Sequence, residues 1–178
     1  MASLNDIHLL IVDDNAQMRK LVRALARAGG IVHLSEAETA AQAIEILRAA
    51  PVDLVMVDWK MRPVDGLSFT RMIRWNGNSP NPFVPILMLT AHTEASRVAA
   101  ARDAGVTGFL KKPISTRLFF DRVGSALTDS RQFIRAEDFF GPDRRRAQAS
   151  WYVGPFRRAE DKGRADTFDL DDDLRQIA

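Results

Sequence analysis

The strongest constraint on the fold is a regular alternation, over residues 1–128, of short apolar runs with segments of helical period. Three of the runs, at 8–12, 54–57 and 86–89, hold almost no polar side chains. Strands of this kind are buried on both faces, as they are in parallel sheets covered by helices. The pattern predicts strands at 8–12, 31–34, 54–57, 86–89 and 108–111, and helices from Asn15 to Gly29 and over 40–50, 67–74, 94–104 and 116–127.

Five strands that alternate with five helices predict an α/β fold with an open, doubly wound, five-stranded parallel sheet. In sheets of this type, ligands bind at the carboxyl ends of the strands. The residues that directly follow the strands are therefore the candidates for a functional site.

The composition is that of a globular protein of a reducing compartment. Of the 178 residues, 46% are apolar, 27% are charged and none is cysteine, so disulfides and thiolate metal sites are excluded. The first ten residues carry no basic stretch, and no apolar run approaches the roughly 18 residues that a membrane helix needs. We expect a cytoplasmic protein without a membrane partner.

Polar side chains stand directly after the predicted strands. Asp13 and Asp14 follow the first strand, Asp58 the third, Thr90 the fourth and Lys112 the last. Because these ends share one edge of the sheet, the carboxylates would repel one another unless a cation lay between them. Mg²⁺ takes a few carboxylates and accepts phosphate oxygens, while hydroxyl and ammonium groups bind phosphate. The set therefore predicts a site for phosphoryl transfer.

In this order, four short segments resemble the receiver domain of two-component response regulators: DD at 13–14, DWKMRPVDG at 58–66, LTA at 89–91 and KKP at 111–113. The resemblance covers residues 6–128 and implies the flavodoxin-like receiver fold. It also implies that Asp58 takes a phosphoryl group from a histidine kinase or a phosphotransfer protein. The chain would then be a signalling module and not an enzyme.

The same resemblance gives roles to neighbouring residues. The phosphoryl oxygens would be bound by Thr90 and Lys112. A Mg²⁺ ion would be held by a larger set, which comprises Asp13, Asp14, Asp58 and the backbone carbonyl of Lys60.

The resemblance also concerns a switch position and two prolines. Phe109 occupies the place of the family's switch aromatic, which turns inward when Thr90 moves toward the phosphate. Lys112–Pro113 is expected to be a cis peptide. One position departs from the family pattern, because Arg62 stands where a proline is usual and Pro63 comes one place later. The effect of Arg62 on dephosphorylation and on Mg²⁺ affinity is left open.

Each of these residues also has an ordinary structural interpretation. An aspartate after a strand is often a helix cap, and Asp58 alone could be a loop aspartate. A threonine or lysine at a strand end is often only solvated, and Phe109 would by default be a core residue. The functional interpretation is favoured because all of the ordinary ones would have to hold together, at the correct strand ends.

Residues 129–178 differ from the rest of the chain. They show no sustained helical or alternating period, and their few apolar residues are mostly aromatic. Residues 131–164 hold 9 basic and 5 acidic side chains, whereas 166–178 hold 1 basic and 5 acidic. Such a segment cannot form a second core. We expect an arginine-rich tail that is disordered or becomes ordered on binding a ligand, and no DNA-binding output domain.

The tail repeats itself. FGPDRR at 140–145 returns as VGPFRR at 153–158, and RAED at 135–138 returns at 158–161. A Gly-Pro turn would expose the arginines that follow it. Guanidinium forks bind guanine and phosphate, and aromatic rings stack on bases. Two copies suggest a partner with repeated features.

A receiver followed by an arginine-rich tail resembles the CheY-like cyclic di-GMP effectors of the Cle group, which act at the flagellar motor. The resemblance implies cyclic di-GMP as a ligand, a flagellar switch protein as a partner, and a location at the flagellar pole. The residues assigned to the nucleotide are Arg144, Arg145, Arg146, Arg157 and Arg158 for guanine and phosphate, Trp151 for stacking, and Asp143 and Asp161 for the guanine edges.

Three other functions are open at this point. The chain could be a plain phosphorelay receiver with an inert tail. It could also be a regulator whose basic tail binds nucleic acid, although nucleic acid is not the favoured partner. A phosphatase of the haloacid dehalogenase type also uses Mg²⁺ and an aspartyl phosphate. It is disfavoured because Asp58 lacks the second aspartate of that group's DxD pair.

Overall fold

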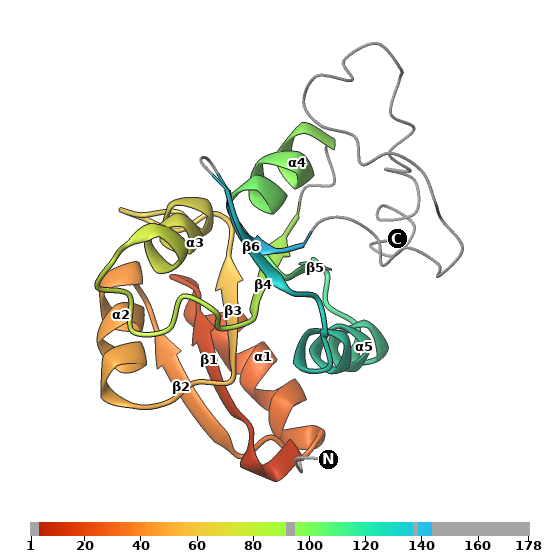
Figure 1. Cartoon of the computed structure of the whole chain (residues 1–178). Coiled ribbons are helices and arrows are strands. Elements are labelled where there is room, and N and C mark those ends of the chain that lie inside the picture. The colour runs from red at the N-terminus through yellow and green to blue at the C-terminus, as the bar shows by residue number, and fades with distance from the viewer. Residues whose placement is uncertain (1–3, 92–94, 137–138, 144–178) are drawn as a thin grey trace.

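The computed structural model describes residues 4–91, 95–136 and 139–143. Its main body is a parallel sheet with the strand order β2-β1-β3-β4-β5, and helices cover both faces (Figure 1). The fold class predicted from the sequence is confirmed. A short 3-10 helix spans Leu4–Asp6; the strands of this sheet are β1 (His8–Val12), β2 (His33–Ala37), β3 (Leu54–Asp58), β4 (Ile86–Thr90) and β5 (Gly108–Lys111), and the helices are α1 (Ala16–Ala28), α2 (Ala40–Ala49), α3 (Gly66–Trp75), α4 (Ala95–Asp103) and α5 (Thr116–Leu127).

The apolar strands are explained by the two layers of helices. Leu9 and Ile11 of β1 belong to a buried cluster with α1 and α5, whereas Leu10 and Val12 belong to a second cluster with α2, α3 and α4. Successive side chains of a strand point to opposite faces of the sheet. Because both faces are covered, neither set of positions can be polar.

The start of α1 is set by its capping residue. The side-chain oxygen of Asn15 accepts hydrogen bonds from the backbone N–H groups of Gln17, at 2.9 Å, and Met18, at 3.3 Å. These bonds satisfy donors that would otherwise lack a partner in the first turn. The helix start predicted from the sequence is therefore confirmed.

The second strand differs from its prediction. The sequence predicts a strand at 31–34, but β2 begins at His33 and runs to Ala37. Ile31 is buried in the cluster of α1 and α5, and its N–H donates to Ala26 O at 3.0 Å. Ile31 thus completes the end of α1, and its apolar character serves the helix layer.

All other predicted boundaries in the main body lie within one residue of the structure, and α5 spans the predicted Thr116–Leu127. Differences of this size are usual at the ends of helices and strands. Within the described part of the chain, no helix is long and apolar enough to cross a membrane.

A small hairpin follows the main body, which the sequence did not predict. Strands β6 (Phe133–Arg135) and β7 (Phe140–Pro142) pair in antiparallel fashion (blue in Figure 1). Phe139 and Phe140 are buried, and the ring of Phe140 meets the ring of Phe83 edge-on, at 5.5 Å between centroids. The hairpin therefore packs against the main body, and it lies within the segment 129–178 that was set apart from the receiver in the sequence.

Candidate functional site

The parallel sheet brings the predicted polar residues to one edge. Asp13 follows β1 directly, Asp58 and Thr90 are the last residues of β3 and β4, and Lys112 follows β5. These four strands are neighbours in the sheet, and all run in the same direction. Their carboxyl ends are therefore adjacent, as expected for a ligand site in an open α/β sheet.

The carboxylates form a compact cluster. One oxygen from each of Asp13, Asp14 and Asp58 lies within 4.8 Å of the others. Asp13 and Asp58 are buried, with 1% and 7% of their surface exposed, whereas Asp14 is exposed. The Nζ atom of Lys112 lies 2.7 Å from Asp58 Oδ1 and 3.3 Å from Asp13 Oδ2. Lys112 thus contacts two of the three carboxylates, and its single positive charge does not balance the three.

Asp13 is the carboxyl of the cluster that is almost fully buried. Desolvation raises the pKa of its carboxyl, and the nearby charge of Asp58 raises it further. A hydrogen bond from the backbone of Asn15 and the charge of Lys112 act in the opposite direction without cancelling the effect. A second cation at this place would stabilise the ionised form of Asp13.

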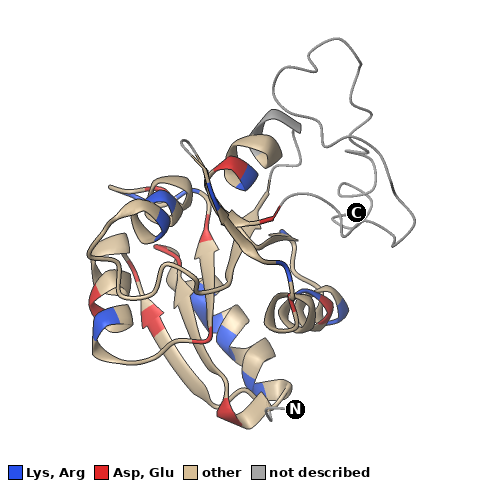
Figure 2. Ribbon diagram, viewed as in Figure 1, with Lys and Arg blue, Asp and Glu red and all other residues tan. Residues whose placement is uncertain are grey.

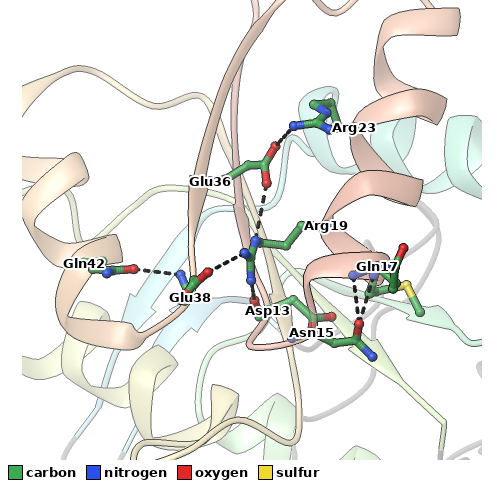
Figure 3. A network of polar contacts seen from close by, with 9 residues as sticks. Asp13, Asn15, Gln17, Arg19, Arg23, Glu36, Glu38 and Gln42 are labelled. Carbon is green, nitrogen blue, oxygen red and sulfur yellow. Dashed lines mark hydrogen bonds and ion pairs between the residues drawn. The ribbon is translucent and has the colours of Figure 1, made fainter.

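A network of polar contacts holds the backbone at Asp13 (Figure 3). Arg19 Nη1 donates to the carbonyl oxygen of Asp13 at 2.7 Å. The same guanidinium pairs with Glu36 at 3.3 Å and with Glu38 at 2.6 Å, and Arg23 pairs with Glu36 at 2.7 Å. The network ties the loop after β1 to β2 and α1, so that Asp13 is presented by a rigid frame.

Sequence reasoning missed this role of Arg19. Helix α1 carries the basic residues Arg19, Lys20, Arg23 and Arg27 and no acidic ones (Figure 2). Its partners Glu36 and Glu38 lie 17 and 19 residues further along the chain. The basic residues along this helix were visible in the sequence as a signal. Their acidic partners become evident only from the placement of β2 beside β1.

The donor set fits a small divalent cation. Asp13, Asp14 and Asp58 offer hard carboxylate oxygens from two adjacent strand ends, two of them buried and one open to solvent. Mg²⁺ prefers such oxygens, needs few of them and keeps several waters. The backbone carbonyl of Lys60, two residues beyond Asp58, belongs to the predicted ligand set.

Comparison with known proteins identifies the arrangement. The Response regulator receiver domain family matches residues 9–124.

The chain belongs to the response regulator receiver family.

Similar receivers include chemotaxis proteins. The chemotaxis protein CheY of Pseudomonas aeruginosa is 29% identical over 115 residues, which cover 65% of this chain and 91% of that protein. The chemotaxis protein CheY-3 of Vibrio cholerae is 32% identical over 110 residues, covering 62% of this chain and 83% of that protein. Receiver domains are signalling modules that bind Mg²⁺ at an acidic aspartate cluster, the feature formed here by Asp13, Asp14 and Asp58.

Solved structures agree on the fold. The structure of Vibrio cholerae CheY4 superposes with a TM-score of 0.63 at 26% identity, over 68% of this chain and 98% of that chain. The receiver domain of NtrX from Brucella abortus gives a TM-score of 0.61 at 24% identity, over 68% of this chain and 99% of that chain. The latter likeness concerns the fold alone. In both cases, about a third of this chain lies beyond the shared receiver.

The other predicted receiver residues lie near the cluster or in the layer beside it. The Lys60 N–H donates to Asp58 Oδ2 at 3.1 Å, and Thr90 is buried with 1% of its surface exposed. Phe109 is 8% exposed and belongs to the apolar cluster of α2, α3 and α4. Lys112–Pro113 is a cis peptide, as expected, and Arg62–Pro63 is a second one.

Gly66 allows the loop after Asp58 to fold back. Its N–H donates to Trp59 O at 3.0 Å. A Cβ atom on Gly66 would overlap the backbone carbonyl oxygen of Asp58 and lie 3.3 Å from Trp59 Cα. Only glycine permits this approach, so the first residue of α3 helps to fix the backbone of the acidic residue.

Of the tail residues assigned to a nucleotide, only Asp143 lies among the described residues. Asp143 is half-buried at the end of the hairpin, and its N–H donates to Gln132 O at 2.7 Å. The remaining ones lie outside the described residues: Arg144, Arg145, Arg146, Trp151, Arg157, Arg158 and Asp161.

Proposed function

We propose that the chain is a phosphorylation-dependent signalling adaptor in which Asp58 accepts the phosphoryl group. The observation that carries the proposal is the ion pair between Asp58 Oδ1 and Lys112 Nζ, at 2.7 Å, within a cluster of three carboxylates. An acceptor needs a carboxylate that is reachable by a donor and flanked by groups that bind phosphoryl oxygens. Asp58 lies at the open edge of the sheet and keeps 7% of its surface exposed.

The transfer itself is a simple displacement. A carboxylate oxygen of Asp58 forms a bond to phosphorus as the bond between phosphorus and a histidine nitrogen of the donor breaks, and the imidazole then takes a proton from water. The ammonium group of Lys112 and the hydroxyl of Thr90 would bind the phosphoryl oxygens. A bound Mg²⁺ would neutralise negative charge on the phosphoryl group. The donor is a histidine kinase or a phosphotransfer protein.

Intact-mass spectrometry tests the acceptor. With Mg²⁺ and a small acyl phosphate as donor, the unchanged protein should gain one phosphoryl group, and Asp58→Asn should gain none. Asp6→Asn, which changes an exposed aspartate of the N-terminal 3-10 helix, is the matched control and should behave as the unchanged protein. Phosphorylation of the Asp58→Asn variant to the normal level would show that another residue is the acceptor.

We further propose that the tail binds cyclic di-GMP. The support is the duplicated sequence, with Gly-Pro followed by arginines in both copies, at 141–145 and 154–158. A ligand with two guanines and two phosphates matches two such copies. Calorimetry with cyclic di-GMP should give saturable heat, which alanine at Arg144, Arg145, Arg157 and Arg158 should abolish. Equal binding of cyclic di-AMP, with a steep loss in salt, would instead favour a tail that binds polyanions such as nucleic acid.

The proposed output is docking to a flagellar switch protein, in the cytoplasm and at the flagellar pole. The support is the likeness to receivers named as chemotaxis proteins. A pull-down with purified switch protein, with and without a phosphoryl mimic, tests this part. No binding in either state would leave a plain phosphorelay receiver as the better assignment.

A further inference from the structure

The hairpin β6–β7 is fitted to one corner of the receiver. We call the described residues of 129–143 the clasp. Gly105, at the corner between α4 and β5, has a φ of +91°, and a Cβ atom on it would overlap Phe140 O of the clasp. A Cβ atom on Gly141 would lie 2.6 Å from Gly105 Cα. Two glycines therefore face each other, and the backbones meet at a distance that no other residue permits.

A buried arginine joins the clasp to the same corner. Arg74 of α3 is 3% exposed and donates to three carbonyl oxygens, those of Gly105 at 3.0 Å, Pro82 at 2.7 Å and Val84 at 2.9 Å. The carbon of its guanidinium lies 5.1 Å from the ring centroid of Phe133 in β6. The guanidinium of Arg74 thus holds together the corner before β5 and the loop before β4, and Phe133 of the clasp packs on this guanidinium.

The start of the clasp is tied to the residue that precedes β5. Arg131 Nη2 donates to Thr107 O at 2.6 Å, and the same nitrogen lies 2.6 Å from Asp129 Oδ2. Thr107 in turn bonds to β4, because its N–H donates to Ile86 O at 2.9 Å and its hydroxyl accepts from Ile86 N at 2.9 Å. The clasp is therefore attached to the amino ends of both β4 and β5.

Lys112, which contacts Asp13 and Asp58 of the acidic cluster, follows the other end of β5. β5 is only four residues long, from Gly108 to Lys111, and it connects the clasped corner to Lys112. It also carries Phe109. Capture of a phosphoryl group on Asp58 requires Lys112 to shift from the carboxylate oxygen to a phosphoryl oxygen. Because packed protein interiors resist deformation, an attachment at one end of a four-residue strand can restrict movement at its other end.

We infer that the clasp is a regulatory element that holds the α4–β5 corner in the arrangement found here, and that it thereby opposes phosphoryl capture at Asp58. The inference rests on the proposed acceptor function. A change that releases the clasp should tighten the binding of a phosphoryl group, and phosphoryl binding should by thermodynamic reciprocity loosen the clasp.

Calorimetric titration with beryllofluoride in the presence of Mg²⁺ tests the inference in the full chain. Gly141→Val should prevent docking of β7, and Phe133→Ala should remove the ring beside Arg74. Both variants should bind beryllofluoride about fivefold more tightly than the unchanged protein, at the lower end of usual coupling strengths. Val32→Ala, at a site that is 56% exposed and precedes β2, is the control and should not differ from the unchanged protein.

Hydrogen exchange supplies the reciprocal measurement. Beryllofluoride should speed exchange of the clasp amides, such as that of Asp143, which bonds to Gln132 O, while leaving the core strands protected. Circular dichroism of each variant confirms that the receiver remains folded. Equal or weaker affinity in both clasp variants would overturn the inference. If the unchanged protein bound no beryllofluoride, the acceptor function would fail, and the inference with it.

Discussion

At the scale of single residues, the site is governed by charge balance. Asp13 and Asp58 are buried carboxylates, and Lys112 is the ammonium group that contacts both. Removing one member of a buried ionic cluster leaves the others uncompensated, which costs more than the ion pair itself contributes. A divalent cation and Lys112 therefore serve partly the same purpose, since each neutralises the same two carboxylates.

Replacement of Lys112 should make stability depend on Mg²⁺. Without the cation, Lys112→Met should lower the free energy of unfolding by about 1–3 kcal/mol, because two buried carboxylates lose their partner. Millimolar Mg²⁺ should restore much of this loss, measured by thermal unfolding with and without the ion. Lys111→Met, one position earlier in β5, is the matched control. Equal stabilisation of both variants by Mg²⁺ would contradict the shared role.

Gly66 gives a second prediction at this scale. Gly66→Ala would place a methyl group against Asp58 O and should lower the unfolding free energy by about 1–3 kcal/mol, as overpacking usually does. Gly77→Ala is a suitable control, because nothing lies within 4 Å of a Cβ atom at that position. Chemical denaturation measures both. If the two variants lost the same stability, the close approach at Gly66 would not be the cause.

At the scale of secondary-structure elements, the clasp shows how a weak hairpin becomes ordered. Two strands of three residues are not stable alone in water. Here they gain the edge-on contacts of Phe133 and Phe140 with Phe83, at 5.3 and 5.5 Å, and the cation of Arg74 below Phe133. Burial lowers the pKa of Arg74 to about 9, and its three carbonyl partners favour the charged form at neutral pH.

The ion pair at the start of the clasp should make its docking sensitive to acid. Burial alone would raise the pKa of Asp129, but hydrogen bonds and the charge from Arg131 outweigh this and lower it below 3.8. A carboxyl whose pKa is lowered on folding contributes stability above its unfolded pKa and loses it as the pH falls through the folded value. The contribution should thus be complete at neutral pH and disappear below pH 3.8.

Asp129→Asn isolates this contribution. At pH 7 the variant should exchange its clasp amides faster than the unchanged protein, because Arg131 loses its partner. The difference between the two proteins should be constant from neutral pH down to about pH 5 and should shrink at lower pH. A difference that persisted undiminished well below pH 3.8 would rule out the ionised carboxylate as its source.

At the scale of the whole molecule, the acidic cluster and the clasp lie at opposite edges of the sheet. The acidic cluster is at the carboxyl ends of β1 and β3, and the clasp is at the amino ends of β4 and β5. The arginine-rich segment begins directly after Asp143, which the clasp holds through Gln132. In the described part of the chain, the clasp is the link between that segment and the receiver.

Cyclic di-GMP should therefore favour phosphoryl capture. When cyclic di-GMP binds the arginines after Asp143, it should break the hydrogen bond from Asp143 N–H to Gln132 O and so release the clasp. We expect cyclic di-GMP to tighten beryllofluoride binding about fivefold, with an equal effect of beryllofluoride on cyclic di-GMP affinity. In Gly141→Val, where the clasp is already released, the two ligands should bind independently. Calorimetry measures the affinity of each ligand in the absence and presence of the other, in the unchanged protein and in Gly141→Val. If the two ligands still strengthened each other's binding about fivefold in Gly141→Val, the coupling would not depend on the clasp.

The sheet and the composition of its acidic edge follow from local features of the amino-acid sequence. Fully apolar runs of strand length are required wherever both faces of a sheet are covered, and this requirement is local enough to be read residue by residue. Parallel strands must end together, so Asp13, Asp58, Thr90 and Lys112 were expected at one edge before any coordinates were known.

The contacts that join distant elements depend on how those elements pack in three dimensions. Arg19 reaches Glu36 and Glu38, and Arg74 reaches Gly105 across 31 residues. Gly141 of the hairpin meets Gly105 of the main body. None of these pairs follows a periodic pattern. Two three-residue strands have no stability of their own, so their order comes entirely from the surface on which they dock.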